Sequence, residues 1–297
     1  MLMRAEKVPC MRRKDFVMTT SSSGAPSLAG LSGTIVLVGV GKMGGALLEG
    51  WLALGLDPKS VIAIEPQPTP ELTALTKRGL RLNPSASDAG SAAAVVIALK
   101  PQVAPSAMMS LKCHVGSDTL VLSIMAGSTL AFLEREFMVN AIVRAMPNTP
   151  ASIGRGITVA VPNKQVTSPQ HQLADALLSA TGTVAWIDNE SFMDAVTAVS
   201  GSGPAYVFLL AESLARAGVA AGLPPDLAMK LARETVAGAG ELLKRSALDP
   251  SVLRQNVTSP GGTTAAALDV LMASDGLDPL MQKAVAAATR RSKELAG

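Results

Sequence analysis

The sequence has few of the residues that carry out chemistry by themselves. It contains two cysteines, Cys10 and Cys113, and two histidines, His114 and His171, among 297 residues. This set is too small for a zinc site or a disulfide framework, so we expect no metal. Cys113 and His114 are adjacent, but neighbours in sequence seldom face each other, and no third partner is evident. We therefore interpret both as surface or loop residues rather than as a reactive pair.

Aromatic residues and long apolar runs are also scarce. Aromatic side chains make up 3% of the chain, which leaves no stacking platform for nucleic-acid bases. The net charge of +3 arises in residues 1–30, which hold five basic and two acidic residues, so the rest is near neutral. The longest apolar runs, such as Ala92–Leu99, fall far short of the roughly 20 residues of a membrane helix. We expect a soluble, cytoplasmic protein that binds neither nucleic acid nor membrane.

Residues 1–30 are predicted to form a disordered N-terminal extension. The stretch from Thr19 to Gly33 is rich in serine and glycine and has no hydrophobic periodicity. The segment is basic and contains serines, as organelle-targeting peptides do, but Glu6 and Asp15 interrupt it and the apolar core of a secretory signal is missing. A non-native extension, with translation starting at Met18, explains the same features equally well.

The strongest motif follows this extension. Residues 34–48 begin as a strand-like apolar run, pass through glycines and continue as a helical pattern; the turn itself reads Gly39, Val40, Gly41, Lys42, Met43, Gly44. Its three glycines have the dinucleotide-binding spacing: the first turns the chain, the second admits the pyrophosphate, and the third lets helix and strand pack closely. Glycine-rich turns also serve plain β-to-α connections, but the strand before and the helix after favour a dinucleotide, whose phosphates the helix N-terminus would attract.

Glu65 is the candidate for the ribose end of that dinucleotide. It ends the predicted strand Val61–Ile64 and lies 26 residues beyond Gly39. An acidic side chain near this place in the fold accepts hydrogen bonds from the adenosine ribose hydroxyls. The alternative is a solvated residue at a strand end, followed by the proline-rich loop 66–70.

The chain up to about Asp188 alternates strands and helices. The predicted strands are 61–64, 93–99, 119–123, 156–161 and 183–187, and the predicted helices are 46–54, 71–78, 103–110 and 169–179. Alternating βα units predict a doubly wound, mostly parallel sheet, whose ligands bind beyond the carboxyl ends of the strands. The loops expected there carry Leu99, Lys100, Pro101, Ala126, Gly127 and Asn148. Lys100 fits either a ligand contact or a solvated surface charge.

From residue 189 onward the pattern is helical. The predicted helices are 204–221, 225–244, 251–256, 263–273 and 278–295, rich in alanine and glycine. Such helices approach closely but bury little area each, so a partner subunit would supply the missing burial. We predict a dinucleotide-binding domain over 31–188 and an intersubunit helical domain over 189–297; the alternative for the latter is a self-contained monomeric bundle.

Two loops of the helical part combine hydroxyls with glycines. Residues 200–206, SGSGPAY, open the first long helix, and residues 256–264, NVTSPGGTT, open a later one. Hydroxyls and glycine N–H groups at a helix N-terminus suit a carboxylate. Ordinary capping explains the first loop as well, whereas the second has more hydroxyls and glycines than a cap requires.

These two loops, together with residues 145–150, AMPNTP, resemble pyrroline-5-carboxylate reductase, and the similarity runs from about Ile35 to Leu295. The resemblance implies reduction of 1-pyrroline-5-carboxylate to L-proline, the last step of proline biosynthesis, with NADPH or NADH. It also implies an α/β Rossmann domain followed by an all-α dimerisation domain, with active sites completed across a homodimer. Family members often assemble such dimers into rings.

The same resemblance implies roles for individual residues. Ser259, Gly261, Gly262 and Thr263 are expected to bind the substrate carboxylate, Thr264 the imine nitrogen, and Asn256 to lie near nicotinamide and substrate. Around the cofactor it places Gly39–Gly44, Leu99, Lys100, Pro101, Ala126, Gly127 and Asn148.

Two positions depart from the family pattern. Asp249-Pro250 stands where many members have His-Pro, and Glu65 replaces a small hydroxyl residue often used beside a 2′-phosphate. NADH is therefore expected to serve at least as well as NADPH. Two other functions stay open at this point: a β-hydroxy acid dehydrogenase, which shares the glycine motif and a helical second domain, and a non-catalytic nucleotide sensor.

Overall fold

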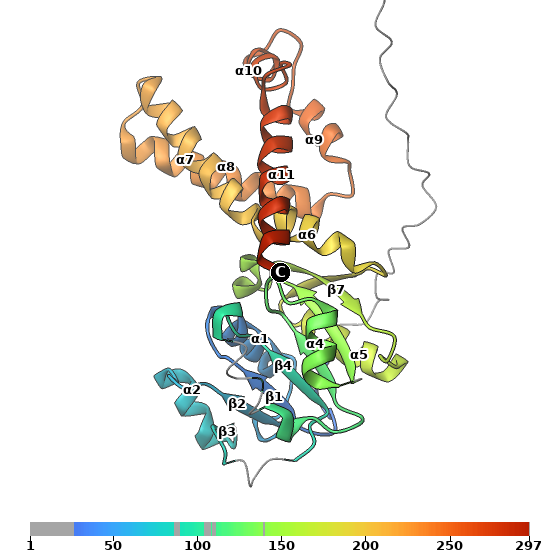
Figure 1. Cartoon of the computed structure of the whole chain (residues 1–297). Helices are drawn as coiled ribbons and strands as arrows, with labels where there is room; N and C mark the ends of the chain where they lie inside the picture. Colours follow the sequence, from blue (N-terminus) through green and yellow to red (C-terminus); the bar gives the residue numbers. More distant parts are fainter. Residues whose placement is uncertain (1–26, 86–89, 104–107, 109–110, 139, 297) are drawn as a thin grey trace, which may run out of the picture. The chain divides into compact units, whose positions relative to one another are not determined.

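The computed structural model describes residues 27–85, 90–103, 108, 111–138 and 140–296. They form two compact units (Figure 1). The first contains residues up to Ala145 together with Ala151–Phe192, and the second contains Met146–Pro150 together with the chain from Met193 onward. Residues 1–26 of the expected extension and most of the expected helix 103–110 lie outside the described residues.

The first unit is built on an eight-stranded sheet with the order β3-β2-β1-β4-β5-β6-β7-β8. Its strands are β1 (Ile35–Val38), β2 (Val61–Ile64), β3 (Arg81–Leu82), β4 (Ala94–Ile97), β5 (Leu120–Ser123), β6 (Ala141–Met146), β7 (Gly156–Pro162) and β8 (Gly182–Trp186). The pairs from β3 through to β6, and β7 with β8, are parallel. The order reverses between β1 and β4, which is the switch point where doubly wound sheets bind ligands. The expected doubly wound, mostly parallel sheet is confirmed.

The helices of this unit include α1 (Lys42–Ala53), α2 (Pro70–Ala74), α4 (Leu130–Phe137) and α5 (Ser168–Ser179). Alternate residues of β1 face opposite sides of the sheet, as the period of a strand requires. Ile35 and Leu37 join a core cluster with α1 and α5, whereas Val36 and Val38 join a second cluster with α4. The sheet is thus buried on both faces, which explains why its central strands are continuous apolar runs rather than alternating ones.

Two helices differ from the sequence prediction. The helix expected over 71–78 is shorter: α2 passes into a 3-10 turn, Leu75–Arg78, which ends at Gly79 with φ of 97°. The α4 helix was not expected at all. Thr129 caps it, because its hydroxyl accepts a 3.1 Å hydrogen bond from the Phe132 N–H.

Two buried side chains correct the sequence prediction. Leu28, assigned to the extension, is 2% exposed, and its N–H donates to the Leu54 carbonyl at 2.9 Å. The ordered chain therefore begins before residue 31. His114 was expected at the surface or in a loop; it lies in a 3-10 turn but is 4% exposed, and burial lowers its pKa. Its neighbour Cys113 is exposed.

The second unit is helical. It contains α6 (Met193–Val196), a π-helical segment (Thr197–Gly201), α7 (Gly203–Ala220), α8 (Pro225–Arg245), α9 (Pro250–Asn256), α10 (Thr263–Leu271) and α11 (Leu277–Ala296). The five helices expected from the sequence are present, with ends that differ by at most two residues. The π-helical segment was not expected.

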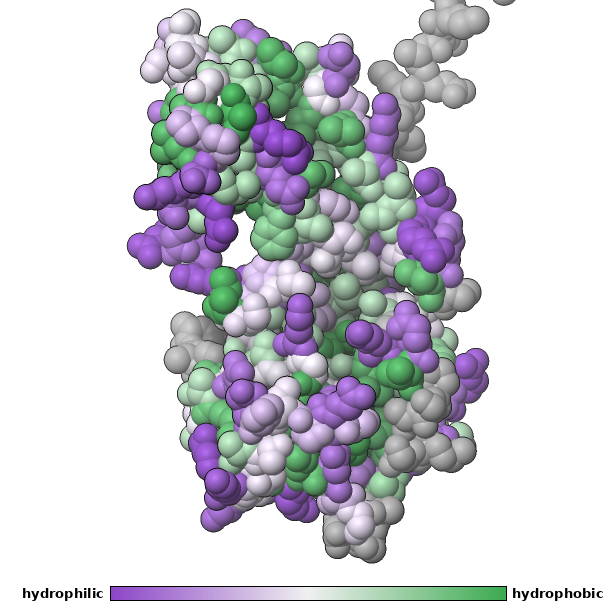
Figure 2. All heavy atoms as spheres, turned by 90° about the vertical axis from the view of Figure 1, so that its left-hand side faces the viewer, coloured by the Kyte–Doolittle hydropathy of each residue, from purple (hydrophilic) through white to green (hydrophobic). Residues whose placement is uncertain are grey.

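The helices of the second unit bury little. In the part that the structure describes, their buried hydrophobic side chains are Met193, Ala198, Ala215, Ala228 and Ala232. Hydrophobic residues, green in Figure 2, reach the surface of the helical unit. The large apolar side chains exposed along α7 and α8 include Val207, Phe208, Leu209, Leu210, Leu214, Leu227, Met229, Leu231, Leu242 and Leu243. Among the described residues, no helix is both long enough and apolar enough to cross a membrane.

Candidate active site

The turn between β1 and α1 has the conformation that its glycines predict. Gly39 has φ of 85°, and a Cβ there would lie 2.8 Å from the Ala98 carbonyl oxygen and 3.0 Å from Leu99 Cδ2. A Cβ on Gly44 would collide with the Gly39 carbonyl, so both glycines are required by the packing of the chain itself. A Cβ on Gly41 would meet nothing within 4 Å. The space over Gly41 therefore suits the pyrophosphate of a dinucleotide.

The start of α1 completes this phosphate cradle. Gly41 is the N-cap residue and supplies no side-chain hydrogen bond, and the first turn of α1 has no acidic residue. The N–H groups and positive dipole of the helix end therefore stay available to an anion. Within the turn, Lys42 is exposed, whereas Val40 and Met43 are partly buried. The residues present fit a dinucleotide.

Glu65, at the end of β2, is tied to the same turn. Its carboxylate accepts the Val40 N–H at 2.8 Å and the Gln67 N–H at 3.0 Å. Its peptide is paired with Asn83, whose side chain accepts the Glu65 N–H and donates to the Glu65 carbonyl, both at 2.8 Å. Glu65 is thus hydrogen-bonded to the glycine turn between β1 and α1 and is more than a solvated residue at a strand end. The sequence offered a signal for Asn83, because Asn-Pro after a short strand is typical of a turn.

The loops after β4 and β5 leave the same edge of the sheet. Leu99 is partly buried, and its side chain lies over Gly39. Lys100 is exposed, and its carbonyl accepts the Val103 N–H at 3.1 Å in the 3-10 turn that Pro101 opens. Beyond β5, Ala126 is exposed, and Gly127 has φ of 76° in the turn before α4. These loops lie where the switch-point rule expects ligand contacts. Asn148 is partly buried in the segment Met146–Pro150, which groups with the second unit.

An ion pair between buried Arg144 and half-buried Glu190, which the sequence did not reveal, supports the start of α4. Arg144 of β6 has a side chain that is 6% exposed, and its Nη1 lies 2.6 Å from Glu190 Oε1. The same carboxylate oxygen accepts the Leu130 N–H at 2.7 Å, at the first position of α4. Glu190 thereby joins β6 to the N-terminus of α4, next to Ala126 and Gly127. The available signal was a charged residue inside the apolar run of a strand.

The α10 loop contains the hydroxyls and glycines that the sequence assigns to the substrate. Gly261 has φ of 69°, and the Gly262 N–H closes the turn onto the Ser259 carbonyl at 3.0 Å. Gly262 is the N-cap of α10 and contributes no side-chain bond. Within the described chain, the hydroxyls of Ser259, Thr263 and Thr264 make no hydrogen bond. These hydroxyls therefore do not cap α10, and the helix N-terminus remains open to an anion.

The α9 helix leads into this loop. Asn256, an exposed residue, ends the helix. At its other end Asp249 is the N-cap, and its carboxylate accepts the Ser251 N–H at 2.8 Å. Hydrogen bonds from Ser251 hold the pKa of Asp249 below its ordinary value. The aspartate thus has a capping role in this chain at the place where many family members have histidine.

The SGSGPAY loop differs from the expected cap. The Ser202 N–H donates to the Thr197 carbonyl at 2.8 Å, which is the i to i+5 bond of a π-helix, and α7 starts without a side-chain cap. The Tyr206 hydroxyl donates to the Ala198 carbonyl at 3.0 Å and fixes this segment. Among the described side chains, the buried Ser200 Oγ has no partner. π-helical segments often occur at functional sites.

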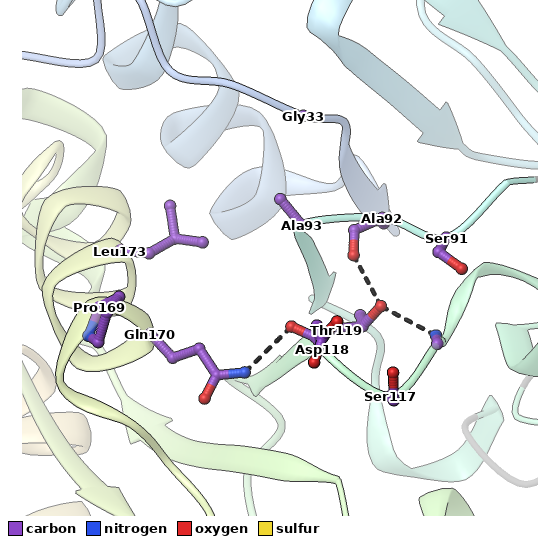
Figure 3. Close-up of a pocket in the computed structure, with 11 residues that line it drawn as sticks. Gly33, Ser91, Ala92, Ala93, Ser117, Asp118, Thr119, Pro169, Gln170 and Leu173 are labelled. Atoms are coloured by element: carbon purple, nitrogen blue, oxygen red, sulfur yellow. Dashed lines mark hydrogen bonds between the residues drawn. The ribbon is translucent and has the colours of Figure 1, made fainter.

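A further pocket lies at the opposite edge of the sheet. It has a volume of about 440 Å³ and is lined by residues that precede β1, β4 and β5 and by the start of α5. Figure 3 shows the Thr119 hydroxyl between the Ala92 carbonyl and the Gly116 N–H, and the Gln170 amide donating to the Asp118 carbonyl. Its polar groups are thus largely engaged within the chain, and it lies away from the carboxyl ends of the strands where a cofactor binds.

Comparison with known proteins identifies the family. Residues 190–295 match the model described as pyrroline-5-carboxylate reductase dimerisation, and residues 34–127 match that of NADP oxidoreductase, coenzyme F420-dependent. A pyrroline-5-carboxylate reductase of Synechocystis sp. is 42% identical over 87% of this chain and 97% of its own length. The chain belongs to the pyrroline-5-carboxylate reductase family.

Solved structures agree with this assignment. A pyrroline-5-carboxylate reductase from Coxiella burnetii has 35% identity and a TM-score of 0.82, over 89% of this chain and 99% of its own. The Plasmodium falciparum enzyme, solved with NADP bound, has 32% identity and a TM-score of 0.74, over 89% and 98% of the two chains. These matches confirm the family that the three sequence motifs indicated, and they confirm the expected fold class. They also confirm that the chain is an NAD(P)H-dependent oxidoreductase of proline biosynthesis. The match of the helical unit to a dimerisation model supports a homo-oligomer.

Proposed function

We propose that this chain reduces 1-pyrroline-5-carboxylate to L-proline with NADH or NADPH, by hydride transfer to the C=N bond of the cyclic imine. The observation that carries the substrate half is the α10 loop. Three of its four hydroxyls, those of Ser259, Thr263 and Thr264, make no hydrogen bond within the described chain, and its helix end has no side-chain cap. The pyrroline-5-carboxylate reductase family, to which the chain belongs, uses a substrate with one carboxylate and one basic ring nitrogen, which are the groups such a loop can hold.

The α10 loop would hold the substrate at two points. The hydroxyls of Ser259 and Thr263 and the N–H groups of Gly261 and Thr263 bind the carboxylate, with Gly262 beside them as the N-cap residue, and the dipole of α10 assists. The Thr264 hydroxyl donates a hydrogen bond to the imine nitrogen. This bond draws electron density away from the C=N carbon. Asn256 contributes to the same substrate site from the end of α9. The nitrogen takes up one proton as the carbon accepts the hydride, and the product is a secondary amine.

The first unit supplies most of the cofactor site. When bound, the reduced nicotinamide provides the hydride, so the protein mainly binds and orients. We assign this role to the turn and loop residues at the carboxyl edge of the sheet and to one residue of the Met146–Pro150 segment: Gly39, Val40, Gly41, Lys42, Met43, Gly44, Glu65, Leu99, Lys100, Pro101, Ala126, Gly127 and Asn148. The functional domains would then be 31–188 for the cofactor and 189–297 for the substrate and dimer contact.

Substrate choice is tested by spectrophotometry. The purified chain should oxidise NADH or NADPH with 1-pyrroline-5-carboxylate, and should not reduce NAD⁺ or NADP⁺ with β-hydroxy acids. Thr264→Ala should slow this reaction, whereas Thr289→Ala, its matched control, should not, because the Thr289 hydroxyl donates to the Val285 carbonyl within α11. Oxidation of β-hydroxy acids alone would assign the chain to the related dehydrogenases, and cofactor binding without turnover of either substrate would indicate a nucleotide sensor.

We also propose that the second unit forms a homodimer through the exposed apolar face of α7 and α8, in a protein of the cytoplasm. Exposed large side chains on both helices would be covered by a second copy. Leu210→Glu should lower the mass measured by analytical ultracentrifugation from dimer to monomer. Met138→Glu, which changes a 73% exposed side chain of the first unit, should not. If the dimers assemble into a ring, the measured mass would be a multiple of the dimer mass. Leu210→Glu would then lower it to that of the monomer or of a smaller assembly.

A further inference from the structure

The side chain of Asn83 extends the hydrogen bonding between β3 and β2 beyond the point where the backbone of β3 turns away. β3 ends at Leu82, and the Asn83 N–H still donates to the Ala63 carbonyl at 2.8 Å. Asn83 then has φ of 46°, in the left-handed region that asparagine tolerates better than other residues with side chains. Its amide takes over the pairing: Oδ1 accepts the Glu65 N–H and Nδ2 donates to the Glu65 carbonyl, both at 2.8 Å. A primary amide is the side chain that offers both groups at once.

This pairing fixes the backbone from which the Glu65 carboxylate extends. The peptide groups of Glu65 are held by Asn83, and the two carboxylate oxygens are held by the Val40 and Gln67 N–H groups. Because the acid is fixed before a ligand arrives, little conformational entropy is lost when the ligand binds. Each carboxylate oxygen still has acceptor capacity, since each can take more than one hydrogen bond.

Such a fixed carboxylate distinguishes two kinds of dinucleotide. A ribose with free hydroxyls can donate to Glu65, whereas a 2′-phosphate brings negative charge against it. A mobile carboxylate could swing aside and admit the phosphate, but a carboxylate clamped at its peptide and at both oxygens cannot do so without breaking hydrogen bonds.

We propose that Asn83 is a specificity-determining positioning residue, which clamps the Glu65 peptide and so favours a dinucleotide with a free adenosine 2′-hydroxyl over a 2′-phosphorylated one. This inference rests on the proposed cofactor site at Glu65. Asn83 itself touches neither cofactor nor substrate in this account. A purely structural role at the end of β3 would change stability and the active fraction, but would change the KM of NADH and that of NADPH by the same factor.

The test uses Asn83→Gly and Asn83→Asp in the full chain. Glycine accepts the left-handed backbone without strain and removes both side-chain bonds, so its effect reports the clamp. Aspartate can still accept the Glu65 N–H, but it has no donor for the Glu65 carbonyl. We expect Asn83→Gly to raise the KM for NADH about five- to twentyfold, to change the KM for NADPH less than twofold, and to leave kcat within twofold. Asn83→Asp should shift the ratio of the two KM values in the same direction.

Two further measurements complete the test. In a Glu65→Ser background, Asn83→Gly should no longer change the ratio of the two KM values, because the clamped group is gone. Dissociation constants of NADH and NADPH, from quenching of protein or cofactor fluorescence without substrate, should show the same shift. These constants report on Asn83 even if the chain fails to reduce 1-pyrroline-5-carboxylate, which would refute the proposed substrate alone. An unchanged NADH to NADPH ratio in folded Asn83→Gly, or in folded Asn83→Asp should the glycine variant not fold, would overturn the proposal.

Discussion

Among single residues, the groups that point most directly to a substrate site are hydroxyls that make no hydrogen bond within the described chain. Ser259, Thr263 and Thr264 surround the start of α10, yet the helix begins at an uncapped glycine. A hydroxyl at the N-cap position would bond one of the free N–H groups, but the N-cap here is Gly262, and Thr263 and Thr264 are the first two residues of the helix. This arrangement leaves both the three hydroxyls and the N–H groups at the start of α10 for a ligand.

Thr264→Ala should reduce kcat/KM for 1-pyrroline-5-carboxylate by about 1 to 3 kcal/mol, the range for a buried polar group left unpaired. The bond to the imine nitrogen strengthens as hydride arrives, so the loss should appear in turnover, while cofactor binding barely changes. Ser259→Ala should mainly raise KM, because the carboxylate contact is equal in the ground and transition states. Steady-state kinetics measured alongside the melting temperature check both expectations. A well-folded Thr264→Ala enzyme with unchanged kcat/KM would remove Thr264 from the mechanism.

A second prediction concerns Glu65 and the choice between NADH and NADPH. We expect NADH to be used at least as well as NADPH, and Glu65→Ser to shift the ratio of kcat/KM values toward NADPH about tenfold, or about 1.4 kcal/mol. Glu65→Gln is the matched control, since it keeps an acceptor for the Val40 N–H and removes only the charge. It should move the ratio in the same direction. Strong selectivity of the unmodified enzyme for NADPH would contradict this role.

Sequence reasoning at this scale succeeded where a residue type is required by geometry. The spacing of Gly39, Gly41 and Gly44 predicted a turn that no other residue type can form, because a Cβ on the first or third glycine meets neighbouring atoms. It missed Asn83 and Arg144, because their partners lie 18 and 46 residues away in the sequence. Such pairings can be recognised only once the strand order is known.

At the scale of elements, Glu190 links three parts of the first unit. Its carboxylate pairs with buried Arg144 on β6 and accepts the first N–H of α4. α4 itself follows the turn that contains Ala126 and Gly127, so this pair fixes the helix next to a loop that we propose to contact the cofactor. Strands and long helices could be predicted from periodicity. The π-helical segment Thr197–Gly201 could not, since one extra residue in a helical turn leaves no periodic signal, even though the Tyr206 hydroxyl that bonds it is nearby in sequence.

Glu190→Ala should lower the free energy of unfolding by about 3 kcal/mol, because it leaves the Arg144 charge buried without its partner. Urea unfolding followed by circular dichroism measures this change. Glu241→Ala is the matched control: its ion pair with Arg245 is solvent-exposed on α8, so its loss should cost less than about 1 kcal/mol. Equal midpoints for the two variants would show that the Glu190 pair adds nothing beyond a surface pair.

At the scale of the whole molecule, the two units differ in how they are stabilised. The first has two large core clusters, whereas the helices of the second bury one methionine and a few alanines in the residues that the structure describes. The alanine and glycine content of the second unit predicted this difference, because small side chains bury little area. The family match supports a homo-oligomer, and the exposed apolar side chains of α7 and α8 are the reason for proposing these two helices as its contact surface.

A chain that begins at Met18 should fold and turn over normally. The first described core residue is Leu28, which this truncation retains. Circular dichroism and kcat/KM of the truncated and full chains, compared at matched concentration, check this expectation. Loss of activity in the folded, shorter protein would give the removed residues a role.

The purified chain should convert 1-pyrroline-5-carboxylate to L-proline. The most direct measurement follows NADH oxidation at 340 nm and quantifies L-proline in the same reaction by chiral chromatography. Our account predicts one L-proline formed for each NADH oxidised, with both rates reduced together in Thr264→Ala. NADH oxidation without L-proline, or no reaction with either NADH or NADPH in a folded protein of dimer mass or larger, would contradict it.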